Sequence, residues 1–142
     1  MPVNYKIYKA KRTDKFNGKW YARASHTNTI DTQGLAEIMQ SNCTLKRSDI
    51  VAVITELVEV MTTQLQNSMK VKLDGFGTFK IGIKSTPADT AKDFSASTNI
   101  QGVHVLFAPE LKRNADGTSR RTFLNNVRLQ EETEYSVDKT EA

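Results

Sequence analysis

Hydrophobic positions first follow a two-residue period along this chain. Val3, Tyr5 and Ile7 alternate with polar residues, which predicts a half-buried strand. Residues 20–24, WYARA, predict a returning strand, because an Asn-Gly turn signal lies between the two runs. Residues 1–25 are therefore predicted to form a β-hairpin.

Two helical patterns follow. The first runs from about residue 31 or 32 to residue 42, with Leu35, Ile38 and Met39 on one face. The second runs to about Asn67 and repeats apolar residues at helical spacing, while further valines extend its apolar surface to a second side. A helix that is apolar on more than one side needs more than one neighbour, which favours burial against a second subunit. These positions are Ile50, Val53, Ile54, Leu57, Val58, Met61 and Leu65, with Val51 and Val60 on the second side.

The remaining chain returns to a strand pattern. Strands are predicted at residues 70–74, 77–84 and 100–107, with a turn at 114–117 and a short strand over 122–129. Residues 85–99 are polar and predict a mobile loop whose one large apolar residue is Phe94. Beyond Leu129 the composition predicts no regular structure.

Charge is distributed unevenly along the 142 residues. The net charge is +4, but residues 130–142 hold five acids and one base, which gives about −4, so residues 1–129 carry +8. A basic body is typical of a protein with an anionic partner, usually nucleic acid, although a soluble protein that happens to be basic fits equally well. The acidic tail either competes for the basic surface or adds solubility.

Several function classes lack their signatures. No apolar run reaches the roughly 20 residues that span a bilayer, and the N-terminus has no signal-peptide core. The single Cys43 excludes an internal disulfide and fits a reducing compartment. His26 and His104 stand apart from it, with no metal-ligand spacing and no phosphate-cradling GxxxxGK[ST] motif. We therefore expect no enzyme, no catalytic residue, no metal, no cofactor and no membrane partner.

The most specific motif is the decapeptide VKLDGFGTFK at residues 71–80. In the order helix, strand, GFGTF, strand, this segment resembles the HU and integration host factor family, bacterial proteins that bind and bend DNA. The run GVHVLFAP at residues 102–109 resembles the strand that returns from the family's DNA-embracing arm. The resemblance covers about residues 30–113, and the N-terminal hairpin resembles an extension in a divergent, Bacteroidetes-type branch of HU-like proteins.

The resemblance implies an α+β, HU-like fold. It places two helices on a small antiparallel sheet with an extended arm, in an intertwined dimer. The expected domains are the hairpin extension 1–25, an HU-like domain 26–113 with its arm at 84–100, and a C-terminal extension 114–142 with the acidic tail. Family arms reach into the minor groove, where an apolar wedge kinks the duplex.

This chain departs from the family at the arm. Family arms carry several arginines around a GRNP motif, whereas the equivalent stretch here, KSTPADTAKDFSASTN, has neither. Its two lysines are offset by two aspartates, so wedge-driven bending is not carried over. Phe94 is the one arm residue that could replace the wedge, although packing against the loop or contact with a partner is favoured. Trp20 and Tyr21 could stack on bases, although covering the sheet is favoured.

Candidate DNA contacts are the cations and glycines around these elements, each with a structural alternative as a solvated face, an exposed cap or a tight turn. The GFG turn could present backbone amides to a phosphate, and the late basic cluster, together with the arm lysines, is the preferred contact. The predicted DNA-binding residues are Lys46, Arg47, Lys70, Lys72, Gly75, Gly77, Lys80, Lys84, Lys92, Lys112, Arg113, Arg120 and Arg121.

The sequence thus predicts an HU-like protein that binds double-stranded DNA through phosphate contacts with little sequence preference. It would act as a homodimer, or as a heterodimer with a related subunit, in the cytoplasm as part of the nucleoid. The alternative is a structural assembly module on the same fold, for instance a ring or connector subunit of a phage virion.

Overall fold

The computed structural model describes residues 1–137 and 139 and divides the chain into two compact units. The first combines residues 1–30 with the chain from residue 126 onward, and the second comprises residues 31–125. The three consecutive domains expected from the sequence stay a prediction, and the compact units are not consecutive because the last residues join the first. In the described part of the chain, no helix is both long and apolar enough to cross a membrane.

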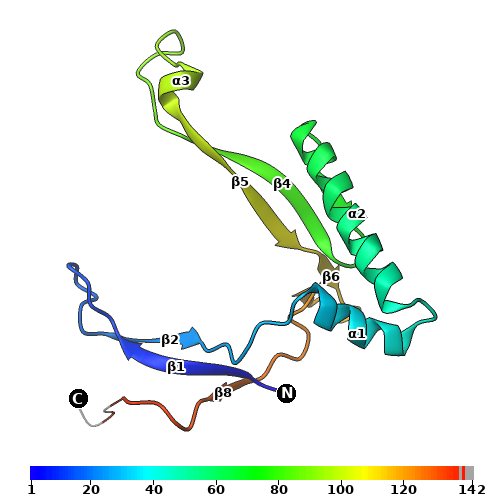
Figure 1. Ribbon diagram of the computed structural model, residues 1–142. Helices are drawn as coiled ribbons and strands as arrows, with labels where there is room; N and C mark the ends of the chain where they lie inside the picture. Colours follow the sequence, from blue (N-terminus) through cyan, green and yellow to red (C-terminus); the bar gives the residue numbers. More distant parts are fainter. Residues whose placement is uncertain (138, 140–142) are drawn as a thin grey trace. The chain divides into compact units, whose positions relative to one another are not determined.

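The first unit is a three-stranded sheet. β1 (Val3–Lys9) pairs antiparallel with β2 (Trp20–Ala24), which confirms the predicted hairpin. β8 (Leu129–Glu131) adds to the other edge of β1 in parallel, as Figure 1 shows. The predicted strand over 122–129 is wrong, because Phe123 and Asn126 take positive φ angles that interrupt extended backbone. Strand pairing in this part of the chain begins only at Leu129, the last residue of the predicted range, and continues to Glu131 in β8.

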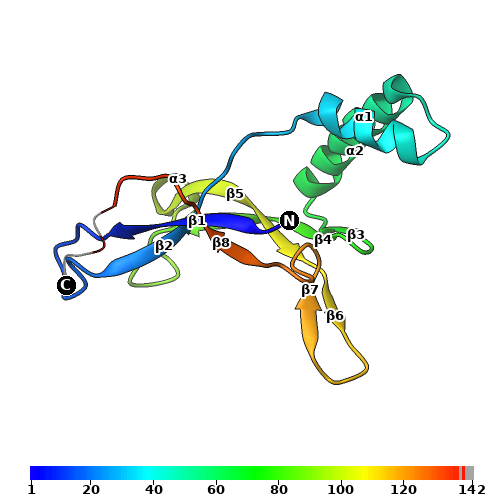
Figure 2. The ribbon, with the colours of Figure 1, turned by 90° about the horizontal axis from the view of Figure 1, so that it is seen from below.

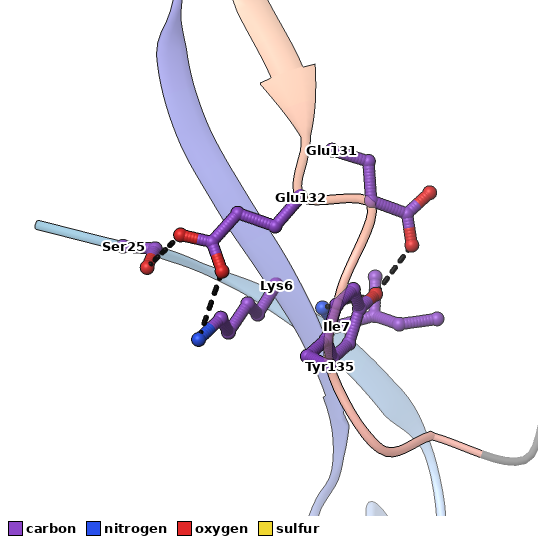
Figure 3. A network of polar contacts seen from close by, with 6 residues as sticks. All are labelled: Lys6, Ile7, Ser25, Glu131, Glu132 and Tyr135. Atoms are coloured by element: carbon purple, nitrogen blue, oxygen red, sulfur yellow. Dashed lines mark hydrogen bonds and ion pairs between the residues drawn. The ribbon is translucent and has the colours of Figure 1, made fainter. Parts of the chain in front are cut away.

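Polar contacts hold the C-terminal residues against the hairpin, as Figure 3 shows. The Tyr135 hydroxyl accepts a hydrogen bond from the Ile7 amide at 3.2 Å and donates a short one to Glu131. Glu132 pairs with Lys6 at 2.8 Å, and its carboxylate accepts a bond from the Ser25 hydroxyl at 2.5 Å. Two acids of the predicted tail are therefore engaged inside the first unit, while Asp138 and Glu141 lie outside the described residues.

We expect the first unit to lose stability in acid. Hydrogen bonds from Lys6 and Ser25 lower the pKa of Glu132, so its stabilising contribution is present above the ordinary glutamate value of 4.5 and is lost as the pH falls through the lowered pKa. Trp20, the only tryptophan, lies in this unit and reports its unfolding by fluorescence. Glu132→Gln should flatten the pH dependence of the melting temperature below pH 4.5, the ordinary glutamate value. Glu134→Gln, an exposed neighbour, should retain it, and equal curves would contradict the assignment.

The second unit begins with the two predicted helices. α1 (Thr32–Asn42) is capped by Asp31, whose side chain accepts a hydrogen bond from the Gly34 amide at 2.9 Å. α2 (Arg47–Gln66) begins after Lys46, which makes no side-chain cap. The Gln40 side chain of α1 instead accepts the Arg47 amide at 2.7 Å, so α1 supplies the cap of α2.

An antiparallel sheet in the order β3-β4-β5 follows the helices. β3 (Val71–Leu73) is short, whereas β4 (Gly77–Ser85) and β5 (Ile100–Pro109) run side by side as a long ribbon that ends at α3 (Ala96–Asn99) (Figure 1). β6 (Leu111–Arg113) and β7 (Ser119–Arg121) form a separate small hairpin, as Figure 2 shows. The predicted α+β class and the turn at 114–117 are confirmed, whereas the short α3 was not predicted.

The second unit has little interior of its own. Among its residues, all of which are described, only Ala36 and Ile50 are buried hydrophobic side chains. Three apolar surfaces stay open: one on α1, one on α2 and one on the β4–β5 ribbon. They comprise Leu35, Ile38 and Met39; Val53, Leu57 and Val60; and Ile81, Ile83, Val103, Val105 and Phe107.

Candidate functional site

The β4–β5 ribbon separates apolar and cationic side chains by register. Residues opposite one another across antiparallel strands share a face, and successive residues alternate between faces. Phe79 opposite Phe107 and Ile83 opposite Val103 therefore lie on one face. Lys80 and Lys84 lie on the other, with Gly82 between them opposite His104. Both lysines are exposed, so this face offers two ammonium groups along one ribbon.

Lys72 continues the cationic face onto β3. It stands opposite Thr78, which shares the face of Lys80. Its ammonium group lies 3.6 Å from Asp74 and 3.8 Å from Glu110, so part of its charge is offset. Lys70 lines a cavity of about 310 Å³ together with Lys80 at the end of α2. The structure thus gathers Lys70, Lys72, Lys80 and Lys84 on β3 and β4 or immediately before them.

A backbone amide of the GFG turn, that of Gly75, already has a hydrogen-bond acceptor within the protein. Gly75 takes a φ of +75° and donates its amide hydrogen to the Glu110 carboxylate at 2.6 Å. The Glu110 amide in turn donates to the Phe76 carbonyl at 3.1 Å. The geometry is that of a closed strand connection, and a phosphate at this turn would have to displace Glu110. Phosphate binding by Gly75 and Gly77 therefore stays a prediction.

Four phenylalanines pack around this turn. Phe76 contacts Phe79, Phe107 and Phe123 with ring centroids 6.0, 5.7 and 5.2 Å apart. Phe79 and Phe107, opposite each other in the ribbon, are 4.7 Å apart. The GFGTF motif therefore anchors the base of the ribbon through aromatic contacts.

Asn99 organises the loop at the far end of the ribbon. Its side-chain amide donates to the carbonyls of Thr86 and Pro87, both at 3.3 Å, and its carbonyl accepts the Ser95 amide at 2.9 Å. Lys92 is exposed in this loop, and Phe94 keeps 44% of its surface exposed. Phe94 is thus accessible, and its role as a wedge stays a prediction.

The cations at the start of α2 are placed differently. Lys46 is exposed, whereas the Arg47 guanidinium forms an ion pair with Glu37 of α1 at 2.6 Å. Arg47 therefore helps to join the two helices, and a DNA contact would compete with this pair.

The late basic cluster is brought together by the β6–β7 hairpin but divided between its faces. Lys112 stands opposite Arg120, while Arg113 and Arg121 lie on the other face. Arg121 also donates to the Pro109 carbonyl at 3.4 Å. At the hairpin turn, hydrogen bonds from Thr118 lower the pKa of Asp116. This hairpin therefore presents cations on two sides rather than as one patch.

The charge of the protein is concentrated elsewhere. Residues 31–125, which form the second unit, hold eleven lysines and arginines and ten acids, for a net charge of +1. Residues 1–30 hold seven lysines and arginines and one acid, for a net charge of +6. The sequence-based reasoning omitted these hairpin cations, although a charge count by segment would have found them.

A protein-family model and solved structures are similar to this chain. The sequence matches the family model HU-HIG, described as an HU domain fused to a wHTH, Ig or glycine-rich motif, over residues 1–123. A crystal structure of a putative bacterial DNA-binding protein from Bacteroides vulgatus matches the fold with a TM-score of 0.54 and 16% identity. That match covers 75% of this chain and 41% of that protein, so the chain spans about two fifths of its length.

A second solved structure is more distant. The Anabaena HU–DNA cocrystal structure matches with a TM-score of 0.40 and 18% identity, over 56% of this chain and 85% of that one. No curated protein matches the sequence. The family match and the first solved structure confirm the HU-like fold predicted from GFGTF and its context.

Proposed function

Because the chain belongs to the HU-HIG family, whose members join an HU domain to further motifs, we propose that it binds double-stranded DNA with little sequence preference. The observation that carries the proposal is the family match over residues 1–123. The cationic face of the β4–β5 ribbon supports it, because Lys80 and Lys84 lie on β4, the strand that leads into the segment 84–100 that the resemblance identifies as the DNA-embracing arm.

Phosphate contacts would supply the affinity. Lys72, Lys80 and Lys84 share one face of the sheet, and lysine side chains at such spacing follow a phosphate backbone without reading bases. The arm has no arginine, and its two aspartates balance its two lysines. Binding is therefore proposed without the wedge-driven kink that the resemblance would imply, and the natural setting is the nucleoid in the cytoplasm.

We infer that the binding form is a dimer. The open apolar surfaces of α1, α2 and the ribbon belong to one compact unit whose described interior is very small. Exposed apolar area of this kind favours association, because covering it removes hydrocarbon from water. The partner is a second copy of this chain or a related subunit.

A fluorescence anisotropy titration with linear duplex DNA tests the function. At ~50 mM salt we expect binding, with log K falling against log salt with a slope of about −2.7 or steeper, which corresponds to three or more phosphate contacts. A slope that does not change with DNA sequence would agree with phosphate-dominated binding.

Tail competition is tested with a truncated chain that ends at Val137 and so lacks Asp138, Lys139 and Glu141. Removing two acids and one base raises the net charge from +4 to +5, which should leave binding equal or tighter. Absence of binding to linear, nicked and bent duplexes by both forms would contradict the proposed function.

One observation favours a structural assembly module as the second candidate. All five residues of β2 are exposed, and within the described residues β2 pairs only with β1, so its outer edge can accept a strand from another subunit. Native mass spectrometry distinguishes the two functions. A dimer agrees with the DNA-binding proposal, whereas a large closed ring agrees with assembly.

A further inference from the structure

The N-terminal hairpin is the most strongly charged part of the molecule. Residues 1–30 carry a net charge of +6, whereas residues 31–125, which include the whole β4–β5 ribbon, carry +1. Five of the seven cations lie between the last residue of β1 and the residue before β2. They are Lys9, Lys11, Arg12, Lys15 and Lys19.

The loop that carries these cations is ordered by its own hydrogen bonds. Gly18, with a φ of +76°, and Lys19 both pair with Ala10, through N–O distances of 2.9 and 2.8 Å, which is the arrangement of a glycine β-bulge. Asn17 accepts the Arg12 amide at 3.1 Å through its side chain. Asp14 accepts the Phe16 amide at 3.0 Å in the same way. A loop fixed in this manner loses little conformational entropy on binding a ligand.

The cations differ in how far their charge is already balanced. Arg12 forms an ion pair with Asp14 at 3.1 Å. The Lys15 ammonium lies 5.2 Å from the centre of the Phe16 ring, which does not neutralise it. Lys11 and Lys19 are exposed and have no ion-pair partner among the described residues. Unpaired ammonium groups on an ordered turn attract an anion with several regularly spaced charges.

We propose that this loop, residues 9–19, is a second DNA-contacting element, which binds the phosphate backbone of duplex DNA through Lys11, Lys15 and Lys19. We call it the hairpin tip. The inference rests on the proposed function and adds a site outside the arm. A two-stranded ribbon is narrow enough to approach the major groove of DNA. Phe16 is the one large apolar side chain of the tip and is 43% exposed. A single phenylalanine is too little apolar surface for insertion into a bilayer, which favours nucleic acid over a lipid surface.

A pair of charge-matched variants of the full chain tests the site. Lys11→Gln/Lys19→Gln removes two positive charges from the tip without touching the backbone bonds that order it. The control Arg23→Gln/Arg128→Gln removes two positive charges from the same compact unit at positions outside the loop between β1 and β2. The tip variant should lower the magnitude of the log K against log salt slope by about 1.8 for each hairpin that contacts DNA. Its affinity loss between ~50 and ~200 mM salt should then be about tenfold smaller than that of the unmodified chain.

The outcomes separate this site from the proposed function. If the unmodified chain binds DNA and the tip variant keeps its slope, or changes it no more than the control does, the hairpin site is overturned and DNA binding stands. If the unmodified chain binds no DNA, both the proposed function and the hairpin site are contradicted. A further experiment measures binding to vesicles that contain ~30% phosphatidylserine, an anionic lipid. A tip variant that loses vesicle binding but keeps the DNA slope would overturn the site in favour of a membrane surface. Circular dichroism spectra that match the unmodified chain show that both variants are folded.

Discussion

Replacing Leu57 by glutamate is expected to abolish the proposed dimer at micromolar chain concentrations and, with it, most of the folded structure of residues 31–125. Leu57 lies on α2 between Val53 and Val60, and these three side chains are 40–61% exposed in the single chain. A carboxylate placed there stays in water in the monomer but would be buried without a partner in the dimer. Such a charge costs ~3 kcal/mol or more, and a symmetric dimer contains two of them.

Unfolding should follow dissociation because the second unit has little interior. Because only Ala36 and Ile50 are buried among its described hydrophobic side chains, the single copy removes too little apolar surface from water to offset the entropy of ordering the chain. The melting temperature of the unmodified chain should therefore rise with protein concentration, as expected when folding and association are coupled.

Sedimentation equilibrium and thermal melts at two concentrations measure both effects. Ala52→Glu is the matched control, because Ala52 is an exposed residue of α2 away from the Val53, Leu57 and Val60 strip. This control should keep the dimer and its melting temperature. A monomeric Leu57→Glu variant that melts like the unmodified chain would contradict the dependence of folding on the dimer. A variant that remains a dimer would place the interface elsewhere.

The helices and the ribbon were predictable because their signals are local. Helical spacing of apolar residues predicts α1, and strand alternation around GFGTF predicts β4. The shared face of Lys80 and Lys84 also follows from their even numbering within β4, and that of Lys72 follows once its register opposite Thr78 is known. These features require only neighbours within a few residues, which is the range that a sequence pattern reports.

Features that join distant segments were not predictable in the same way. β8 pairs with β1 across more than a hundred residues, and its residues show no alternation that marks them as a strand. The hydrogen bond from the Gly75 amide to Glu110 spans 35 residues, and the Arg47–Glu37 pair depends on the angle between two helices. The sequence therefore indicated which residues are cationic but not which of them already have a partner in the folded chain.

Gly77→Ala is expected to destabilise the second unit by roughly 2–4 kcal/mol, the range of overpacking and of alanine at an incompatible backbone angle. Gly77 is buried with a φ of +156°, and a Cβ there would overlap the Ala108 carbonyl oxygen and lie 2.6 Å from the Phe107 ring. The carbonyl belongs to the paired strand β5, and the ring is held by Phe76 and Phe79. Neither neighbour can move without opening the base of the ribbon.

Two further glycines provide a graded control for urea unfolding at one fixed protein concentration. Gly75 has open space where an added methyl group would lie but a φ of +75°, so Gly75→Ala should cost only the ~1 kcal/mol of left-handed backbone. Gly102 has neither a positive φ nor a neighbour within 4 Å, so Gly102→Ala should change stability by less than ~0.5 kcal/mol. The loss of stability should therefore decrease in the order Gly77, Gly75, Gly102, because Gly77 combines close contacts with a positive φ, Gly75 has only the positive φ, and Gly102 has neither. Equal losses at Gly77 and Gly75 would show that the close approach of β5 contributes nothing, and that the second glycine of GFGTF serves the turn alone.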